Sequence, residues 1–141
     1  MLRNILLMKS FPANKDLGLL ALRLGGALPL LLKHGLEKVF TFSAMAAHFP
    51  DPLHIGAIPS LLFAMLSDAI CSVLVLVGLA TRWAALVCFT NIFVAWAFVH
   101  HFQFFGRAGG HGELIVLYLA IMLTLFLSGA GKYSVDGLLE K

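Results

Sequence analysis

The sequence is poor in charged residues. Only 12% of its 141 residues are Asp, Glu, Lys or Arg, whereas 60% are hydrophobic. A soluble globular domain carries about 25% charged residues, because polar groups must cover its surface. The composition therefore excludes a soluble domain and predicts an integral membrane protein. A spanning helix uses about 20 apolar residues, so four helices take about 80 positions and leave no room for a second domain.

Cysteine is also scarce. Cys71 and Cys88 lie inside separate apolar runs, without the CxxC spacing of a redox motif or a zinc site. We interpret both as ordinary buried residues. Near the N-terminus the apolar stretch covers only residues 5–8, too short for the core of a signal peptide. Residues 1–16 are predicted to form a cytoplasmic amphipathic segment on the membrane surface.

Four apolar blocks predict an all-α integral membrane four-helix bundle. The spans are expected at about 17–37, 58–79, 83–99 and 112–128, within a membrane domain of residues 17–139. Residues 78–82 form a tight hairpin, while 41–57 and 100–112 are longer loops on the opposite side. With four spans, both termini share the side of the hairpin.

The basic residues orient this bundle. The hairpin side holds Arg3, Lys9, Lys15, Arg82, Lys132 and Lys141, whereas the other side holds Lys33, Lys38 and Arg107. The positive-inside rule then places both termini in the cytoplasm. The basic residues are dispersed around the apolar blocks, so the net charge of +3 predicts membrane orientation and no nucleic-acid partner.

All histidines fall in or beside the two longer loops, on the predicted outer side. They are His34, His48, His54, His100, His101 and His111. Histidine titrates near neutrality, binds metals and donates hydrogen bonds to carbonyl groups. Two interpretations stay open: polar residues collecting in long loops, or a ligand site. Their spacing matches no recognised metal-binding pattern, so no metal site is predicted.

A few polar residues interrupt the apolar spans. Arg23, Asp68 and Asn91 fall in spans one, two and three. A charge near the bilayer centre costs at least about 2.5 to 3.5 kcal/mol, so it usually faces the bundle interior and finds a partner. We predict that Arg23 pairs with Asp68, because an Arg fork matches a carboxylate. The pair either fixes helix packing or forms a site for a proton or a quinone head group.

Glu113 begins the fourth span directly after a glycine-rich segment, residues 106–112. Backbone N–H groups at a helix start favour a carboxylate or an anionic ligand, so Glu113 is either a helix cap or part of a site. His100, His101 and His111 are expected to bring imidazole groups to the same pocket.

The order of these motifs resembles the DoxX family of small membrane proteins. The resemblance covers residues 17–139 and is carried by strings that are weak singly and fairly specific together. They are Arg23-Leu-Gly-Gly26, Lys33-His-Gly-Leu-Glu-Lys38, Ser67-Asp68, Gly78-Leu-Ala-Thr-Arg82, Gly112-Glu113 and Gly129-Ala-Gly-Lys-Tyr-Ser-Val-Asp136.

The resemblance implies a four-helix protein of the prokaryotic cytoplasmic membrane, linked to thiosulfate oxidation with quinone or to oxidative and phenolic stress. The family's polar positions map to Arg23, His34, Lys38, Asp68, Arg82, one of His100 and His101, Glu113 and Asp136. Asp68 departs from the Glu that is common in the family.

Two hypotheses of function follow. In the first, the protein is a quinone-linked oxidoreductase component that binds quinone or a phenolic compound through His34, Lys38, His100, His101, His111 and Glu113. No flavin, haem or iron–sulfur motif is readable, so no resident cofactor is predicted and electrons must come from a redox protein partner. In the second, the protein is a non-catalytic membrane anchor or assembly subunit for a redox partner. The expected partners are the lipid bilayer and either a redox protein or further copies of this chain, as a homo-oligomer. A carrier of small organic molecules is a third hypothesis.

Overall fold

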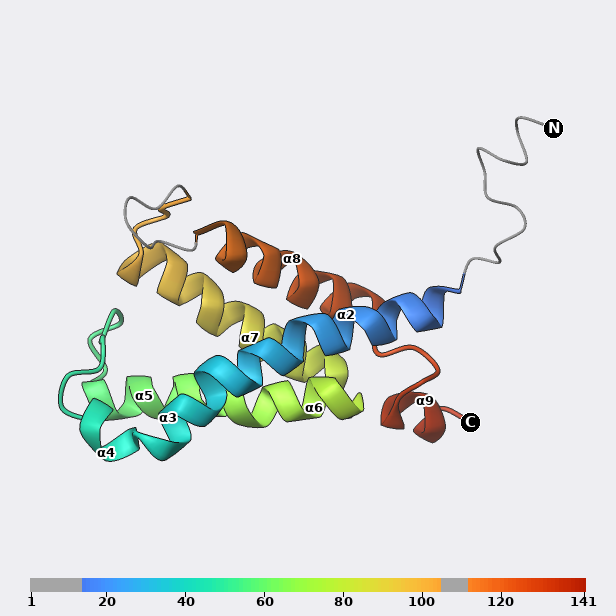
Figure 1. Ribbon diagram of the computed structural model, residues 1–141, viewed down its shortest axis with the longest axis horizontal. Helices are drawn as coiled ribbons and strands as arrows, with labels where there is room; N and C mark the ends of the chain where they lie inside the picture. The colour runs from blue at the N-terminus through green and yellow to red at the C-terminus, as the bar shows by residue number, and fades with distance from the viewer. Residues whose placement is uncertain (1–13, 105–111) are drawn as a thin grey trace.

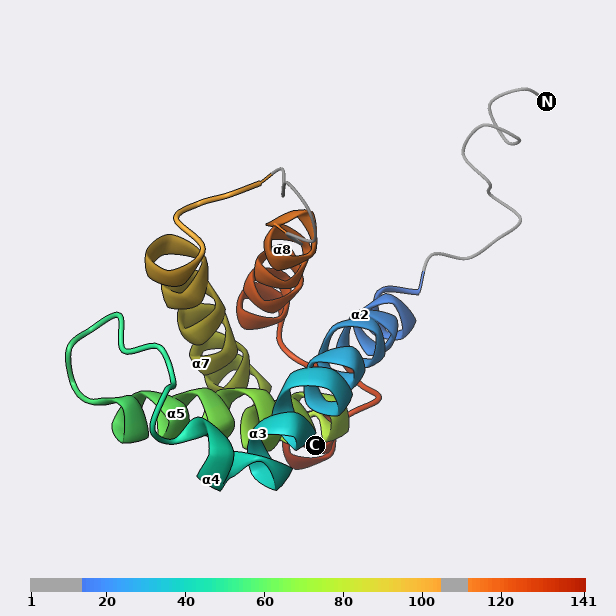
Figure 2. The same ribbon diagram turned by 60° about the vertical axis from the view of Figure 1, so that its left-hand side comes forward.

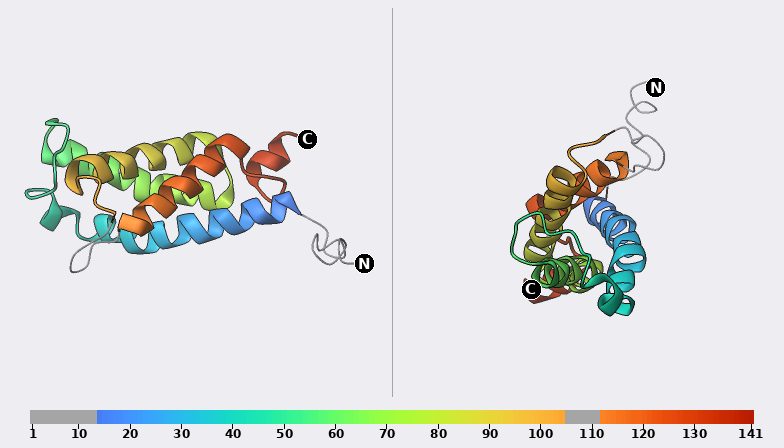
Figure 3. Two further views of the ribbon diagram at one scale, coloured as in Figure 1. Left: turned by 90° about the horizontal axis from the view of Figure 1, so that it is seen from above. Right: turned by 90° about the vertical axis from the view of Figure 1, so that its left-hand side faces the viewer.

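The structure is a computed structural model that describes residues 14–104 and 112–141. Every regular element within these ranges is helical, and they contain no strand. In the part of the chain that the structure describes, three helices are long and apolar enough to cross a membrane, at Lys15–Phe40, Ala57–Val77 and Thr81–Val99. A fourth apolar helix, α8 (Gly112–Ser128), is shorter, with 17 residues. The four run lengthwise around a common core (Figures 1 and 3).

The first long helix is interrupted by a π-helical turn. Its first part, α2 (Lys15–Pro29), begins at Asn14, whose side chain accepts a hydrogen bond of 3.0 Å from the Leu17 backbone N–H. Pro29 has no backbone N–H and so breaks the regular hydrogen-bond ladder. The chain continues as η1 (Leu30–Gly35) and then α3 (Leu36–Phe40).

The next two long helices also contain π-helical turns. The second consists of α5 (Ala57–Met65), η2 (Leu66–Cys71) and α6 (Ser72–Val77), and the third of α7 (Thr81–Val94) and η3 (Ala95–Val99). The predicted span 58–79 extends two residues too far, because Gly78 leaves the helix with a φ of 74°. Two short helices, α4 (Phe42–Met45) and α9 (Val135–Leu139), lie outside the long ones.

The start of α2, the α6–α7 turn, the end of α8 and helix α9 gather at one end of the molecule (Figure 1). The loop between α4 and α5 lies at the other end, on the left of Figure 2. We name these the terminal end and the loop end. Two groups of polar side chains, one at the terminal end and one between the long helices, are described below.

The core is built from small and aliphatic residues. Ala27, Val75, Ala85 and Met122 are completely buried among the four apolar helices. Many large apolar side chains instead point outward, including those of Phe40, Trp83 and Leu127. An apolar exterior of this extent is costly in water and suits contact with lipid chains.

The helices that contain η1 and η2 approach most closely at Gly35. A Cβ atom at this position would collide with the backbone carbonyl of Asp68 and with the Cα of Ala69. Backbone atoms cannot swing away as the end of a side chain can, so this contact requires glycine. This close approach allows Lys38, about one turn after Gly35, to reach Asp68 in η2.

This contact makes a testable prediction with an internal control. We expect Gly35→Ala to lower the free energy of unfolding by about 1–3 kcal/mol, because the methyl group forces the two backbones apart. Gly25→Ala is the matched control, since no atom lies within 4 Å of a Cβ built there. It should be neutral or stabilising by up to about 1 kcal/mol, the helix preference of Ala over Gly. Circular dichroism measures the unfolding of both variants in detergent. Equal changes in stability for Gly35→Ala and Gly25→Ala would show that the contact is unimportant.

Candidate functional site

A buried ion pair lies where η1 and η2 meet. Lys38 Nζ is 2.8 Å from Asp68 Oδ2, and the two side chains are only 11% and 6% exposed. Lys38 comes from α3 and Asp68 from η2, near the middle of the second long helix. The helices around the pair are apolar, so each charge depends on the other for its stability.

The Asp68 carboxylate also joins the third long helix to this pair. Its Oδ1 accepts hydrogen bonds from Ser67 Oγ at 3.0 Å and from Asn91 Nδ2 of α7 at 3.1 Å. One carboxylate therefore connects side chains from all three long helices. We call Lys38, Ser67, Asp68 and Asn91 the polar cluster.

The polar cluster keeps hydrogen-bonding capacity for a ligand. Lys38 Nζ has three N–H bonds, and within the described residues two find acceptors: Asp68 Oδ2, and the His34 carbonyl at 3.3 Å. His34 lies one turn before Lys38 on the same helix face, is half-buried, and its imidazole forms no hydrogen bond with a described residue. The amide oxygen of Asn91 likewise accepts none there. A ligand oxygen can meet both a donor and an acceptor beside the carboxylate.

The predicted pairing of Arg23 with Asp68 is wrong. Arg23 lies twelve residues before Gly35, which is about 18 Å along a helix, and so it cannot reach the η1–η2 contact. Its guanidinium is instead buried at the terminal end, where it donates hydrogen bonds to four backbone carbonyls. These belong to Val75 at 2.9 Å, Leu76 at 2.6 Å, Ala130 at 3.2 Å and Tyr133 at 2.7 Å.

The other motifs at the terminal end cap helices. Asp136 accepts hydrogen bonds from the backbone N–H groups of Ala80 at 2.7 Å and Thr81 at 2.9 Å, at the start of α7. Arg82 donates to the carbonyls of Phe126 and Leu127 near the end of α8, at 2.9 and 2.8 Å. These charged side chains bond the backbone N–H and C=O groups at helix ends, which have no hydrogen-bond partner within the helix. The family-like strings around residues 78–82 and 129–136 thus have a structural role.

The capping role of Asp136 predicts a pH effect. Partial burial raises the pKa of the Asp136 carboxyl, but hydrogen bonds from Thr81 and Ala80 and the charge of Arg23 outweigh it, so the pKa lies below its ordinary value. A lowered pKa stabilises the fold above the ordinary value of about 4, and this stabilisation is lost as the pH falls through the lowered value.

We expect Asp136→Ala to lose about 1 kcal/mol at neutral pH, a usual value for a helix N-cap. Its stability should then fall less between about pH 5 and pH 2 than that of the wild-type protein. Thermal unfolding in detergent across this range checks both effects. Glu140→Gln, an exposed acid on the same segment, is the control. Parallel pH curves for wild type and Asp136→Ala would contradict the capping role.

The remaining predicted residues lie apart from the polar cluster. His100 and His101 are exposed after η3, and Glu113 is exposed in the first turn of α8. In the described part of the chain, no hydrogen bond or ion pair joins these three residues to Lys38 or Asp68. His111 lies outside the described residues. The structure thus brings together His34, Lys38 and Asp68, and adds Asn91 and Ser67.

Sequence reasoning identified Asn91 as a polar residue in an apolar span but gave it no partner, and it gave Ser67 no role beyond its place before Asp68. A partner on another helix could have been predicted for Asn91, because a polar amide in a span usually faces another helix. In residues 14–104 and 112–141, no three His, Cys, Asp or Glu side chains are grouped closely enough to hold a metal ion.

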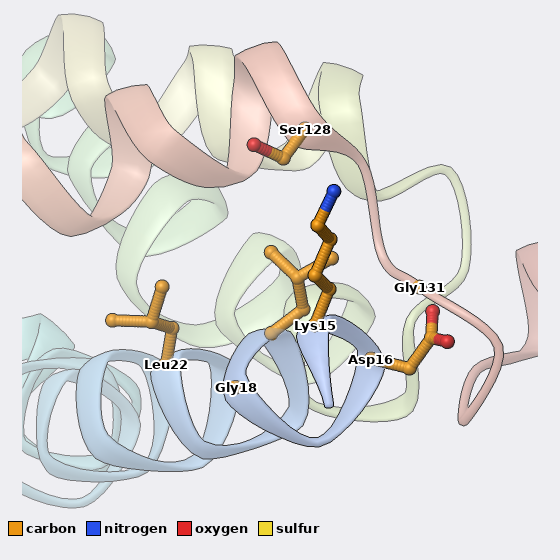
Figure 4. A pocket seen from close by; sticks show the side chains of 7 residues that line it. Lys15, Asp16, Gly18, Leu22, Ser128 and Gly131 are labelled. Atoms are coloured by element: carbon orange, nitrogen blue, oxygen red, sulfur yellow. The ribbon is translucent and has the colours of Figure 1, made fainter. Parts of the chain in front are cut away.

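A cavity of about 680 Å³ lies at the terminal end between α2 and the end of α8 (Figure 4). Figure 4 shows the Lys15 side chain extending from α2 towards Ser128. The cavity is lined by Lys15, Asp16, Gly18, Leu19, Leu22, Ser128 and Gly131. It includes no member of the polar cluster and no predicted site residue, so size alone does not mark the candidate site.

Long apolar helices with buried charges at their contacts define a helical membrane protein. The DoxX family model matches residues 18–101, more than half of the chain, and the chain belongs to this family. An uncharacterized protein of Haemophilus influenzae is 32% identical over 103 residues, which cover 71% of this chain and 67% of the relative. A second uncharacterized protein of that organism is 37% identical over 82 residues, 55% of this chain and 60% of the relative. No solved structure matches the chain.

Proposed function

We propose that the protein is a component of a membrane redox system that binds the head group of a quinone or a related phenolic compound at the polar cluster. The observation that carries this proposal is the Lys38–Asp68 pair, buried between apolar helices and extended by Asn91 and His34. Pockets for such ligands combine apolar walls with a few placed polar groups. π-Helical turns, here η1 and η2, occur frequently at functional sites.

The chemistry of the head group fits these side chains. A quinone carbonyl accepts hydrogen bonds, which the free N–H of Lys38 and the imidazole of His34 supply. A hydroquinone or phenol hydroxyl donates, and the amide oxygen of Asn91 accepts. Reduction of a quinone takes up two protons, and Asp68, Lys38 and His34 are groups that exchange protons. The electrons come from outside the polar cluster, so the proposal includes a redox partner protein.

We further propose that the four apolar helices form a bundle in the prokaryotic cytoplasmic membrane with both termini in the cytoplasm. The terminal end carries Lys15, Arg82, Lys132 and Lys141, and this excess of basic residues supports the orientation. The 17 residues of α8 are within the length that can span the hydrocarbon core. Reporter fusions at Lys141 test this topology, and an external C-terminus would reverse it.

Ligand binding is tested by quenching of tryptophan fluorescence with a soluble ubiquinone analogue, since the chain contains two tryptophans. We expect saturable quenching of the wild-type protein in detergent and about tenfold weaker binding for Asn91→Ala and for His34→Ala. Each loses one hydrogen bond of about 1.4 kcal/mol. His48→Ala, an exposed loop variant, should bind like the wild type.

Equal, unsaturable quenching in all four proteins would reject the quinone site. The non-catalytic anchor is then the better function, and the helix-capping roles of Arg82 and Asp136 agree with it. A partner complex that assembles and turns over normally with Asn91→Ala and His34→Ala would support that alternative.

A further inference from the structure

The two cysteines meet in the core. Cys71 is the last residue of η2 and Cys88 lies within α7, and their exposed fractions are 6% and 0%. The Cys88 thiol lies 3.3 Å from the backbone carbonyl oxygen of Ser67 and donates a hydrogen bond to it. Ser67 is one turn before Cys71 on the same side of that helix. Cys71 and Cys88 also belong to the same cluster of buried residues. Neighbouring helices therefore place a dithiol at their contact.

This dithiol adjoins the polar cluster. Ser67 joins the two, because its hydroxyl donates to Asp68 and its carbonyl accepts from the Cys88 thiol. The surroundings are mostly apolar, with Val75, Ala85 and Met122 in the same buried group, although the buried Ser72 and Tyr118 also lie in this part of the core. Water-soluble oxidants have poor access to such a position, whereas a ligand bound at the polar cluster lies beside it.

We propose that Cys71 and Cys88 are a redox-active dithiol, which a quinone bound at the polar cluster oxidises to a disulfide between η2 and α7. The identity of the oxidant rests on the proposed function, whereas the placement of the two cysteines on neighbouring helices does not. In this step two S–H bonds break and one S–S bond forms. The two electrons and two protons pass to the quinone, which becomes the hydroquinone, so no further reactant is required.

The full-length protein in lipid nanodiscs is treated with a fully substituted benzoquinone, which has no free ring position for thiol addition. A parallel sample receives diamide, a small membrane-permeant thiol oxidant. Each sample is then denatured, labelled with a maleimide and measured by intact mass. We expect both reagents to remove both free thiols of the monomer, with the loss of two hydrogens. Cys71→Ser and Cys88→Ser should each keep one free thiol as monomers.

Each other result overturns a defined part of the proposal. If both thiols stay free with both reagents, or if the disulfide joins two chains, the dithiol is rejected. If diamide forms the disulfide and the quinone does not, the quinone-linked step is rejected. Quinone binding by the Cys71→Ser/Cys88→Ser double variant is then measured. It shows whether only the reaction of the thiols has failed or whether the protein does not bind quinone at all. Retained binding leaves the polar cluster as a quinone site without the dithiol reaction.

Discussion

Replacing Arg23 with alanine is expected to lower the free energy of unfolding by about 3–5 kcal/mol. The guanidinium donates to four carbonyls from two separate segments of the chain, and it is 1% exposed. Removing it leaves these buried and partly buried carbonyls without their charged donor. Arg23→Lys should recover only part of the loss, since a single ammonium cannot reach acceptors that a planar fork spans.

Arg82→Ala is the matched control for this variant. Arg82 also donates to two carbonyls at the terminal end, but its side chain is exposed. Its loss should therefore cost less than about 1 kcal/mol. Chemical unfolding of the three variants in the same detergent measures the difference. If Arg23→Ala and Arg82→Ala lose equal stability, the buried hydrogen bonds of Arg23 do not hold the terminal end together.

Breaking the Lys38–Asp68 pair from one side is expected to be nearly as damaging. Lys38→Met leaves the Asp68 carboxylate buried with only neutral donors, and the loss should be about 3–5 kcal/mol. Asp68→Asn leaves the Lys38 ammonium unpaired and should also destabilise the fold. The double variant removes both charges and replaces the pair by a neutral contact. It should be more stable than the sum of the single effects by about 2 kcal/mol or more.

The double variant also separates folding from function. If the polar cluster binds a quinone, the refolded double variant should show little saturable fluorescence quenching although its helices are intact. Circular dichroism and quenching on one sample make this comparison. Additive losses of stability would show that the two charges do not depend on each other. Unchanged quinone binding would place the ligand elsewhere in the molecule.

Composition and hydropathy were enough to predict the helices. The apolar blocks, together with Gly78 and the polar loop residues, define where each helix begins and ends to within a few residues. The reason is local: a segment in lipid must satisfy its own backbone hydrogen bonds, so a long apolar run becomes a helix whatever its neighbours are. Membership of the DoxX family follows from the same ordered motifs and is confirmed.

The partners of the buried charges could not be predicted in this way. Sequence gives the depth of Arg23 and Asp68 but not the crossing point of their helices, which Gly35 determines. Each π-helical turn also inserts a residue and rotates the side chains that follow by about 100°. A regular 3.6-residue period therefore gives the wrong face for residues after η1, and it could not predict that Lys38 faces Asp68.

The role of the C-terminal motif was hidden for a different reason. Asp136 lies more than fifty residues after the start of α7, which it caps. A local sequence pattern does not predict a contact between residues so far apart. The predicted grouping of the histidines with Glu113 in one pocket stays a prediction. They share a side of the membrane in the sequence-based topology, but His100 and His101 are not bonded to the residues that form the polar cluster.

The hydrogen bonds of Arg23 have a consequence for the order in which the protein folds. Two of the acceptors of its guanidinium, the carbonyls of Ala130 and Tyr133, are translated more than a hundred residues after Arg23 itself. Until the ribosome has passed Tyr133, the first helix carries a cation with an incomplete set of acceptors. A chain truncated before residue 130 lacks two of the four acceptors of Arg23 and should therefore be less stable. The buried cation of the first helix is thus fully hydrogen-bonded only after residues 130–133 have folded against it.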